Sequence, residues 1–336
     1  MMKSKNLVIL VAVLGVLVII YLVQSLTTSK KTVSESLTTV YPDFNQSSVS
    51  YIKAFKQEYP DSGLYFAKKD GQWVITSYFN APARQTEVDK LLDDVKKLQG
   101  EIRSTNEGLF SDYDISDDQA LHLEFLGPDS SVLANILVGK GVPEASSSSF
   151  LRKAGSDTVY MADQNFLSRF AVWNADPAKK LTEKRWAELK MADFDKAKVN
   201  QIALKDNKKE YAFEKQEEMV KGDDDTTQTT KTVWKQTKPS KNPLDEKKIE
   251  DILTRISNLR GSDIVSTTVD KEHGLLSPKY SASVVDSDGQ AFTYYFGAQA
   301  DTSGNNYYAM IEGKPFVYKV AKYNFESIFV NPFKKD

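Results

Sequence analysis

The sequence predicts an α+β protein in which a transmembrane helix precedes two tandem copies of one unit, each an antiparallel sheet packed on one main helix. Three observations predict it: an uncharged apolar run near the start, a helical pattern that recurs at constant spacing, and alternating strands that end on glycine in both halves. The expected segments are a short cytoplasmic tail (1–6), a transmembrane helix (7–26), a Ser/Thr-rich tether (27–48), a first repeat unit (49–178), a helical joint (179–198) and a second repeat unit (199–336).

The apolar run is long enough to cross a bilayer. Asn6 to Ser29 carries no charge, and Leu7 to Val23 is interrupted only by Gly15. A helix of about 17–20 residues spans roughly 26–30 Å, the thickness of the hydrocarbon layer. A cleaved signal peptide is the alternative, but its apolar region is usually shorter and ends in small residues, unlike the "LVQSLTT" found here. We therefore expect an uncleaved anchor that contacts lipid through residues 7–26.

The expected location is the bacterial cytoplasmic (inner) membrane, crossed once, with the large body outside the cytoplasm. Lys3 and Lys5 precede the run and Lys30 and Lys31 follow it, so the excess of positive charge on the inner side is small. The charges alone therefore do not decide the orientation, and we expect the short N-terminal segment to be the cytoplasmic side.

The repeat is visible as a constant offset of 161 residues. The first copy reads Trp73, Pro82, then Val88, Leu91, Leu92, Val95 and Leu98, and ends at Gly100. The second reads Trp234, Pro243, then Ile249, Ile252, Leu253, Ile256 and Leu259, and ends at Gly261. This spacing places the apolar side chains on one stripe of a helix, bounded by proline and glycine.

Further matches follow the helix in both halves. "EGLFSDYDI" (107–115) is paired with "HGLLSPKYS" (273–281), and the alternating "LHLEF" (121–125) with "YSASVV" (280–285). Strands ending at Gly139 and Gly297 are each followed, 21 residues on, by Tyr160 and Tyr318. Turn signals such as "KDGQ" and "DSDGQ" indicate hairpins. Each unit is thus expected to run β-β-α, then four strands and a short helix.

Composition excludes several classes of protein. Lys and Arg number 44 against 46 Asp and Glu, and this near balance disfavours nucleic acid as a partner. The absence of cysteine excludes disulfides, thiolate metal sites and cysteine nucleophiles. The acidic stretch "GDDDTTQ" (222–228) lacks the ligand spacing of a calcium loop and is predicted to be a solvated hairpin tip.

We predict no catalytic residue, no metal and no cofactor. The two histidines, His122 and His273, are not spaced as metal ligands, and His122 is expected to share a half-exposed strand face with Glu124. An envelope hydrolase that uses carboxylates such as Glu124 or Asp112 stays open as an alternative, since sequence cannot place two acids across a substrate.

Four residues are candidates for contact with a ligand or a partner. Trp73 and Trp234 are able to grip a sugar or a peptide if they are exposed, but their repetition at one position favours a role in the core. Lys184 and Arg185 lie in a basic run that either touches lipid or a partner or forms a solvated helix face.

The chain resembles the bacterial family of the domain of unknown function 4340. The resemblance lies in the Trp-helix-Gly order, the "GL" turn, the closing "VY" strand and the phrase "LTEKRWAELKMADFDKAKVNQIAL" (181–204). Members carry an N-terminal transmembrane segment and are often associated with ABC transporters of the gliding-motility auxiliary type. The resemblance implies an envelope protein partner such as an ABC-transporter permease, and it supplies no catalytic residue.

The sequence thus leads to two hypotheses of function. The first is a non-catalytic, membrane-anchored extracytoplasmic accessory protein, an interaction subunit associated with an ABC-type transport system. The alternative is an extracytoplasmic ligand- or carbohydrate-binding module that acts independently of a transporter.

Overall fold

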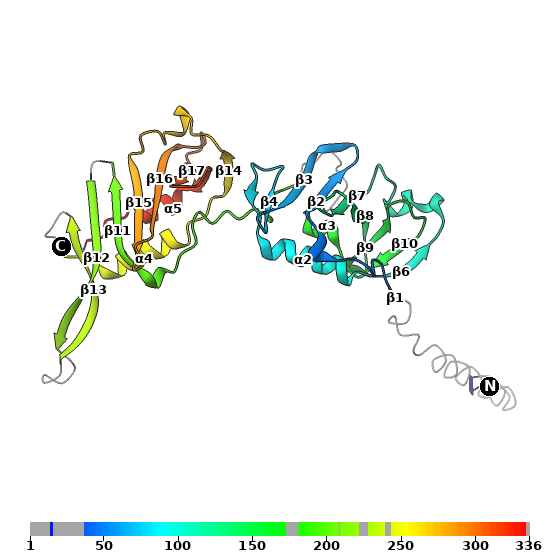
Figure 1. The fold of residues 1–336 in the computed structure, drawn as a ribbon, viewed down its shortest axis with the longest axis horizontal. Coiled ribbons are helices and arrows are strands. Elements are labelled where there is room, and N and C mark those ends of the chain that lie inside the picture. Colours follow the sequence, from blue (N-terminus) through cyan, green and yellow to red (C-terminus); the bar gives the residue numbers. More distant parts are fainter. Residues whose placement is uncertain are drawn as a thin grey trace, which may run out of the picture. The chain divides into compact units, whose positions relative to one another are not determined.

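The computed structural model describes residues 14–15, 37–172, 181–207, 209–221, 228–238 and 243–333. The chain divides into two compact units, Met1–Trp186 and Ala187–Asp336 (Figure 1). The transmembrane helix predicted over 7–26 lies outside the described residues, apart from Leu14 and Gly15, which are helical. No helix within the described ranges has the length and apolar character needed to span a membrane.

The first unit contains a ten-stranded antiparallel sheet in the order β1-β6-β10-β9-β8-β7-β2-β3-β4-β5. Its strands are β1 (Leu37–Thr39), β2 (Tyr51–Lys56), β3 (Tyr59–Lys69), β4 (Gln72–Ile75), β5 (Ala81–Pro82), β6 (Gln99–Ser104), β7 (Leu121–Leu126), β8 (Val132–Val142), β9 (Ala145–Lys153) and β10 (Val159–Ala162). The helices are α2 (Gln85–Lys97) and α3 (Phe166–Arg169), with 3-10 turns at Gln46–Ser48, Glu107–Leu109 and Ser111–Tyr113.

The second unit contains an eight-stranded antiparallel sheet in the order β13-β12-β11-β15-β16-β17-β18-β14. Its strands are β11 (Val199–Asp206), β12 (Lys209–Lys221), β13 (Gln228–Lys238), β14 (Asp263–Ser266), β15 (Tyr280–Asp286), β16 (Ala291–Gln299), β17 (Asn306–Ile311) and β18 (Val317–Ala321). The helices are α4 (Glu246–Ser257) and α5 (Lys322–Ile328), with 3-10 turns at Lys196–Lys198 and Lys271–His273.

The two sheets share one strand order. Without β1 and β5, the first order becomes β6-β10-β9-β8-β7-β2-β3-β4, and each strand has its counterpart at the same place in the second sheet. The α+β class with antiparallel sheets is therefore confirmed. The expected β-β-α start is too short. In both units three strands, β2 to β4 and β11 to β13, precede the helix, and the first unit adds the two-residue β5. A further strand, β6 or β14, follows the helix directly.

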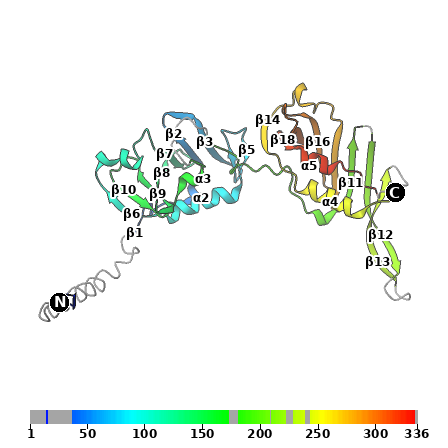
Figure 2. The same cartoon turned by 180° about the vertical axis from the view of Figure 1, so that it is seen from behind.

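The predicted helical stripes form the core of each unit. Val88, Leu91, Leu92 and Val95 of α2 are buried, and so are Ile249, Ile252, Leu253 and Ile256 of α4. Each helix lies along one side of its own sheet (Figures 1 and 2). Burying such apolar side chains contributes about 1.5–3 kcal/mol each, so this stripe stabilises both units.

Glycines at matching positions let the backbone approach its neighbours closely. A Cβ on Gly100 would lie 2.9 Å from Cβ of Tyr160, and one on Gly261 would lie 2.7 Å from Cδ1 of Tyr318. A Cβ on Gly139 or Gly297 would collide with the carbonyl oxygen of Tyr113 or His273. Tyr160 and Tyr318 thus hold equivalent positions, which explains why their surroundings recur in the sequence.

The match between residues 107–115 and 273–281 is wrong in register. Tyr113, not Glu107, takes the position of His273, because its carbonyl oxygen lies against the equivalent glycine. The next residue is left-handed in both units, with φ of 56° at Asp114 and 65° at Gly274. The "GL" phrase misleads because Gly108 starts no left-handed turn, whereas Gly274 ends a 3-10 turn.

The tether and the joint are both shorter than expected. Within the tether predicted over 27–48, residues 37–39 already form β1, and Val40 N donates to Leu98 O at 2.9 Å. The joint predicted over 179–198 contains no α-helix from residue 181 onward, and Met191 N donates to Leu259 O at 3.0 Å. Leu189 and Met191 are buried and Lys190 between them is not, which is the alternation of an extended edge segment rather than a helix.

We predict that two alanine substitutions in β8 will differ sharply in effect. Gly139→Ala should lower the free energy of unfolding of the first unit by about 1–3 kcal/mol, because the new methyl group meets a backbone carbonyl that cannot move freely. Gly141→Ala is the matched control, since its nearest neighbour would lie 3.6 Å away. Denaturant unfolding followed by tryptophan fluorescence measures both, and equal stability of the two variants would contradict the assigned close contact.

Candidate functional site

The two tryptophans singled out as contact residues lie in the core. Trp73 is 3% exposed and Trp234 is 5% exposed. The side chain of Gln85 bonds both backbone groups of Trp73, and the indole of Trp234 donates to Glu250 at 2.7 Å. Neither ring is open to a ligand, so both tryptophans have the core role that their repetition favours and not the alternative contact role. Both are buried because each lies on the strand next to the main helix of its unit, Trp73 on β4 and Trp234 on β13.

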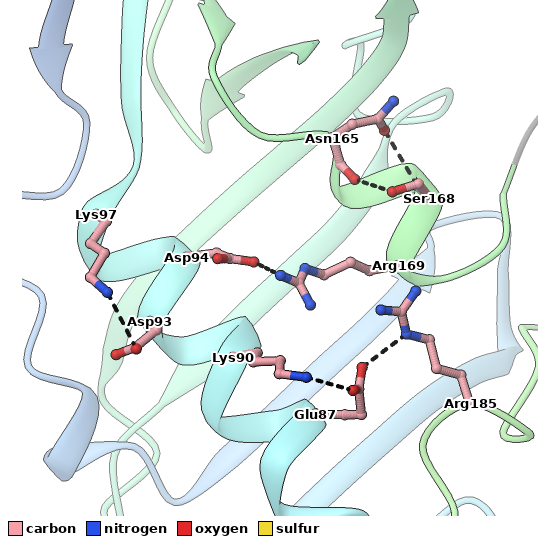
Figure 3. A network of polar contacts seen from close by, with 9 residues as sticks. All are labelled: Glu87, Lys90, Asp93, Asp94, Lys97, Asn165, Ser168, Arg169 and Arg185. Carbon is pink, nitrogen blue, oxygen red and sulfur yellow. Dashed lines mark hydrogen bonds and ion pairs between the residues drawn. The ribbon is translucent and has the colours of Figure 1, made fainter. Parts of the chain in front are cut away.

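Arg185 is engaged in an ion-pair network on α2 (Figure 3). Its Nε donates to Oε2 of Glu87 at 3.0 Å, and Lys90 Nζ donates to Oε1 of the same carboxylate at 3.2 Å. Beside them Arg169 pairs with Asp94. These contacts attach the segment that ends the first unit to its helix. Lys184 is exposed.

The closing segment is also held by its backbone and by aromatic packing. Arg84 N donates to Trp186 O at 2.6 Å, and the fully buried Trp186 ring stacks on Phe170 with centroids 5.0 Å apart. Arg185 therefore serves the architecture of the first unit. A role for it in binding a partner has no support in this geometry.

The two histidines are both buried, contrary to the half-exposed position expected for His122. His122 Nε2 lies 2.7 Å from Asp117 O, and the ring stacks on Phe55 at 5.1 Å. His273 Nδ1 accepts from the backbone N of Asp270 at 2.9 Å. Asp270, Glu272 and His273 bring three donor atoms within 4.8 Å, but these side chains surround a capped 3-10 turn and both acids are exposed. The arrangement is explained by the cap alone.

A different site is formed by aromatic side chains on the strands β2 and β3. An open groove of about 510 Å³, mostly apolar, is lined by Tyr51, Lys53, Phe55, Pro60, Tyr65, Phe66, Ala67 and Thr76. We call it the aromatic groove. Its size falls within the range of ligand-binding pockets.

Strand alternation explains why these rings face outward. In β2, Ile52 and Ala54 are buried, whereas Tyr51, Lys53 and Phe55 lie on the opposite face. In β3, Tyr65 is paired with Lys53, so its ring joins the same face. The Phe55 and Tyr65 ring centroids are 6.4 Å apart, and Tyr51 is 39% exposed. One face of the sheet thus packs against the core, and these strands present aromatic rings on the other face.

Polar groups border the rings. Lys53 Nζ lies 3.3 Å from Oε2 of Glu124 on β7. The Tyr65 hydroxyl donates to Pro60 O at 2.5 Å. Desolvation raises the pKa of Tyr65, and the negative charges of Asp61 and Glu124 raise it further, so the hydroxyl stays a neutral donor. The groove therefore combines apolar rings with one fixed ion pair.

The second unit has no such groove at the equivalent place. Ile52 pairs with Phe125 and Phe66, and Ile202 pairs with Val284 and Phe213, which aligns the two units residue by residue. By this register the counterparts of Tyr51, Lys53, Phe55, Tyr65 and Ala67 are Gln201, Ala203, Lys205, Ala212 and Glu214. All of them except Lys205 line a depression of about 240 Å³, whose one aromatic lining residue, Phe213, is buried. The aromatic groove is specific to the first unit.

Sequence reasoning missed these residues because the repeat was aligned only from Trp73 onward. A usable signal exists: "YIKAF" (51–55) and "QIALK" (201–205) keep apolar residues at the inward positions but differ at every outward one. Residues that are alike in both copies are those the shared fold requires. Residues that differ at the outward positions are candidates for a function specific to one copy.

The network on α2 predicts a pH dependence of stability. Desolvation raises the pKa of Glu87, but the hydrogen bonds from Arg185 and Lys90 outweigh it and leave the pKa below its usual value. A lowered pKa stabilises the fold above the pKa of the unfolded chain, about 4.3, and this contribution is lost as the pH falls through the folded value. The first unit should therefore lose stability below about pH 4, and Glu87→Gln should weaken that dependence.

Urea unfolding at neutral and acidic pH measures this effect. Asp93→Asn is the matched control, because it removes an acid from the same helix whose one ion pair, with Lys97, is exposed. An unchanged acid dependence in Glu87→Gln would show that the network does not hold the helix.

Comparison with known proteins assigns a family but no activity. Residues 73–278, more than half of the chain, match the family described as Domain of unknown function (DUF4340). The matched range begins in β4 of the first unit and ends in the second, so the strands of the aromatic groove precede it. No curated protein and no solved structure shows a significant match. The chain belongs to the family of the domain of unknown function DUF4340.

Proposed function

We propose that this protein is a non-catalytic accessory protein, anchored in the bacterial cytoplasmic membrane, whose extracytoplasmic body binds a protein subunit of an ABC-type transport system. The observation that carries the proposal is the aromatic groove. The apolar run from Leu7 to Val23 supports the anchor. The family resemblance supports the choice of transport system.

The groove has the composition of a protein-binding surface. Tyr side chains are enriched at the centre of interfaces, where they supply a large contact area and lose little conformational entropy. Tyr51, Phe55 and Tyr65 are held by the strand register, so they need little rearrangement to bind. Covering them removes apolar surface from water at about 25 cal/mol per Å². An apolar side chain of the partner is expected to pack on the outer surface of these rings.

The ion pair beside the rings sets orientation. Lys53 and Glu124 are 44% and 20% exposed, so both charges remain available at the border of the groove. A partner polar group that bonds to either one is directed to a single register. Attachment to the same membrane raises the local concentration of a permease and makes even a weak groove contact effective.

We predict that changing the groove will reduce recovery of the partner. The full-length protein, extracted in mild detergent, should co-purify with a permease or another envelope subunit. Tyr51→Ser combined with Tyr65→Ser removes two rings and should reduce that recovery several-fold, while leaving the core residues in place. Gln201→Ser, at the position in the second unit equivalent to Tyr51, is the matched control and should have no effect.

Recovery that is equal for the groove variant and the control would contradict a groove-mediated contact. Purification without any transporter or envelope subunit would contradict the accessory role itself.

A carbohydrate-binding module is the second candidate, and the same groove favours it for a different reason. Open aromatic rings next to hydrogen-bonding groups suit a sugar ring, whose C–H face stacks and whose hydroxyls need donors and acceptors. Lys53, Glu124 and the Thr76 side chain at the groove supply such groups.

A glycan array separates the two candidates. The carbohydrate hypothesis predicts binding of a cell-wall or surface glycan by the full-length protein, and loss of that binding in Tyr51→Ser with Tyr65→Ser. Binding that persists in this variant, or its absence from every glycan tested, would count against the module.

A further inference from the structure

The hairpin of β12 and β13 extends past the rest of the second sheet (Figure 1). β11 pairs with β12 only between Lys209 and Glu214. From Lys215 to Lys221, β12 pairs with β13 alone, opposite residues 228–234. We call these paired segments, 215–221 and 228–234, the ribbon. Its counterpart in the first unit, β3 and β4, turns at Asp70 and Gly71 and has no comparable extension.

Most of the ribbon is exposed on both faces. Residues 216–219 are all exposed, and so are residues 229–232. Since successive side chains of a strand point to opposite faces, neither face of this part is buried. Among its described side chains, packing is found at the base, where the Lys215 ammonium lies 5.1 Å from the Trp234 ring. Two strands without a buried face are marginally stable in water, and a third strand adds the backbone hydrogen bonds they lack.

The outer edge of β13 is open within the described part of the chain. β13 is the last strand in the order of its sheet, and no described strand pairs with its outer side. In the first unit the equivalent strand β4 has only four residues and is covered by β5, which contains Pro82. Short strands, coverage, proline and charged side chains are the usual means of protecting an edge. Of these, β13, with eleven residues and no proline, has only the charged side chains, its lysines.

The charge of β13 indicates which partner fits. The strand carries Lys231, Lys235 and Lys238 and no acidic residue. Lys235 is paired with Glu218 of β12 at 2.8 Å, whereas Lys231 is exposed on the ribbon. Threonines at 229, 230 and 232 favour extended backbone. Like charges on facing strands are destabilising, so these lysines disfavour a second copy of β13 as the added strand.

We propose that the outer edge of β13 binds an extended, acidic segment of another protein by β-strand addition. Backbone hydrogen bonds to the edge supply the affinity. Carboxylates of the added strand pair with Lys231 and the other lysines of β13, which supplies the preference for an acidic segment. This surface is separate from the aromatic groove and its test does not depend on the proposed function.

Hydrogen exchange of the full-length protein in detergent tests the proposal. The probe is a short acidic peptide of alternating glutamate and threonine. We expect it to slow exchange of backbone amides within residues 228–238 and to leave those of α4 unchanged. Lys231→Glu should weaken this protection several-fold. Lys247→Glu makes the same charge change at an exposed position of α4 and should leave the protection intact.

Two control peptides separate strand addition from simple charge attraction. An acidic peptide of equal charge with a proline at alternate threonine positions cannot form the backbone ladder and should give no protection. A lysine-threonine peptide should give none either. Equal protection by the proline peptide would overturn strand addition. If exchange of the amides within residues 228–238 is slow without peptide and slows further as the protein concentration rises, a second copy of the chain occupies the edge. That result would also overturn the proposal.

Discussion

Burial of one helical stripe against one sheet face is the constraint on which each unit depends. Val88, Leu91 and Val95 in the first unit, and Ile249, Ile252 and Ile256 in the second, must be covered on every helical turn. The strands of each sheet therefore alternate, with Ile52 and Ile202 on the buried face.

This constraint leaves the opposite face of each sheet free to change. Residues that face the helix are apolar in both copies, while those that face away have diverged into rings in the first unit and into polar or small residues in the second. The edges have diverged in the same way: β4 is short and covered, and β13 is long and open. Two copies of one fold thus present two different surfaces, which suits a protein that binds more than one partner.

The sequence predicted the parts that depend on periodicity. The two helices and the alternating strands were found because their spacing is regular. The expectation that strands end at Gly139 and Gly297 is wrong, because β8 continues to Val142 and β16 continues to Gln299. The edge segments at 37–40 and 189–191 were missed because a short edge strand bonds through its backbone, which leaves little trace in residue type. The groove was missed for another reason: Tyr51, Phe55 and Tyr65 gather through strand pairing, and pairing register is not visible in a single strand. Trp73 and Trp234 attracted attention as large aromatics, yet burial decides their role.

The central claim is that the first unit binds through a surface the second unit does not share. Site-specific photo-crosslinking in living cells tests it most directly, with a photoreactive phenylalanine analogue placed at Tyr51 in one strain and at the equivalent Gln201 in another. The account predicts a discrete crosslinked adduct from position 51 and none from position 201. Adducts of equal yield from both positions, or an adduct from position 201 alone, would contradict it.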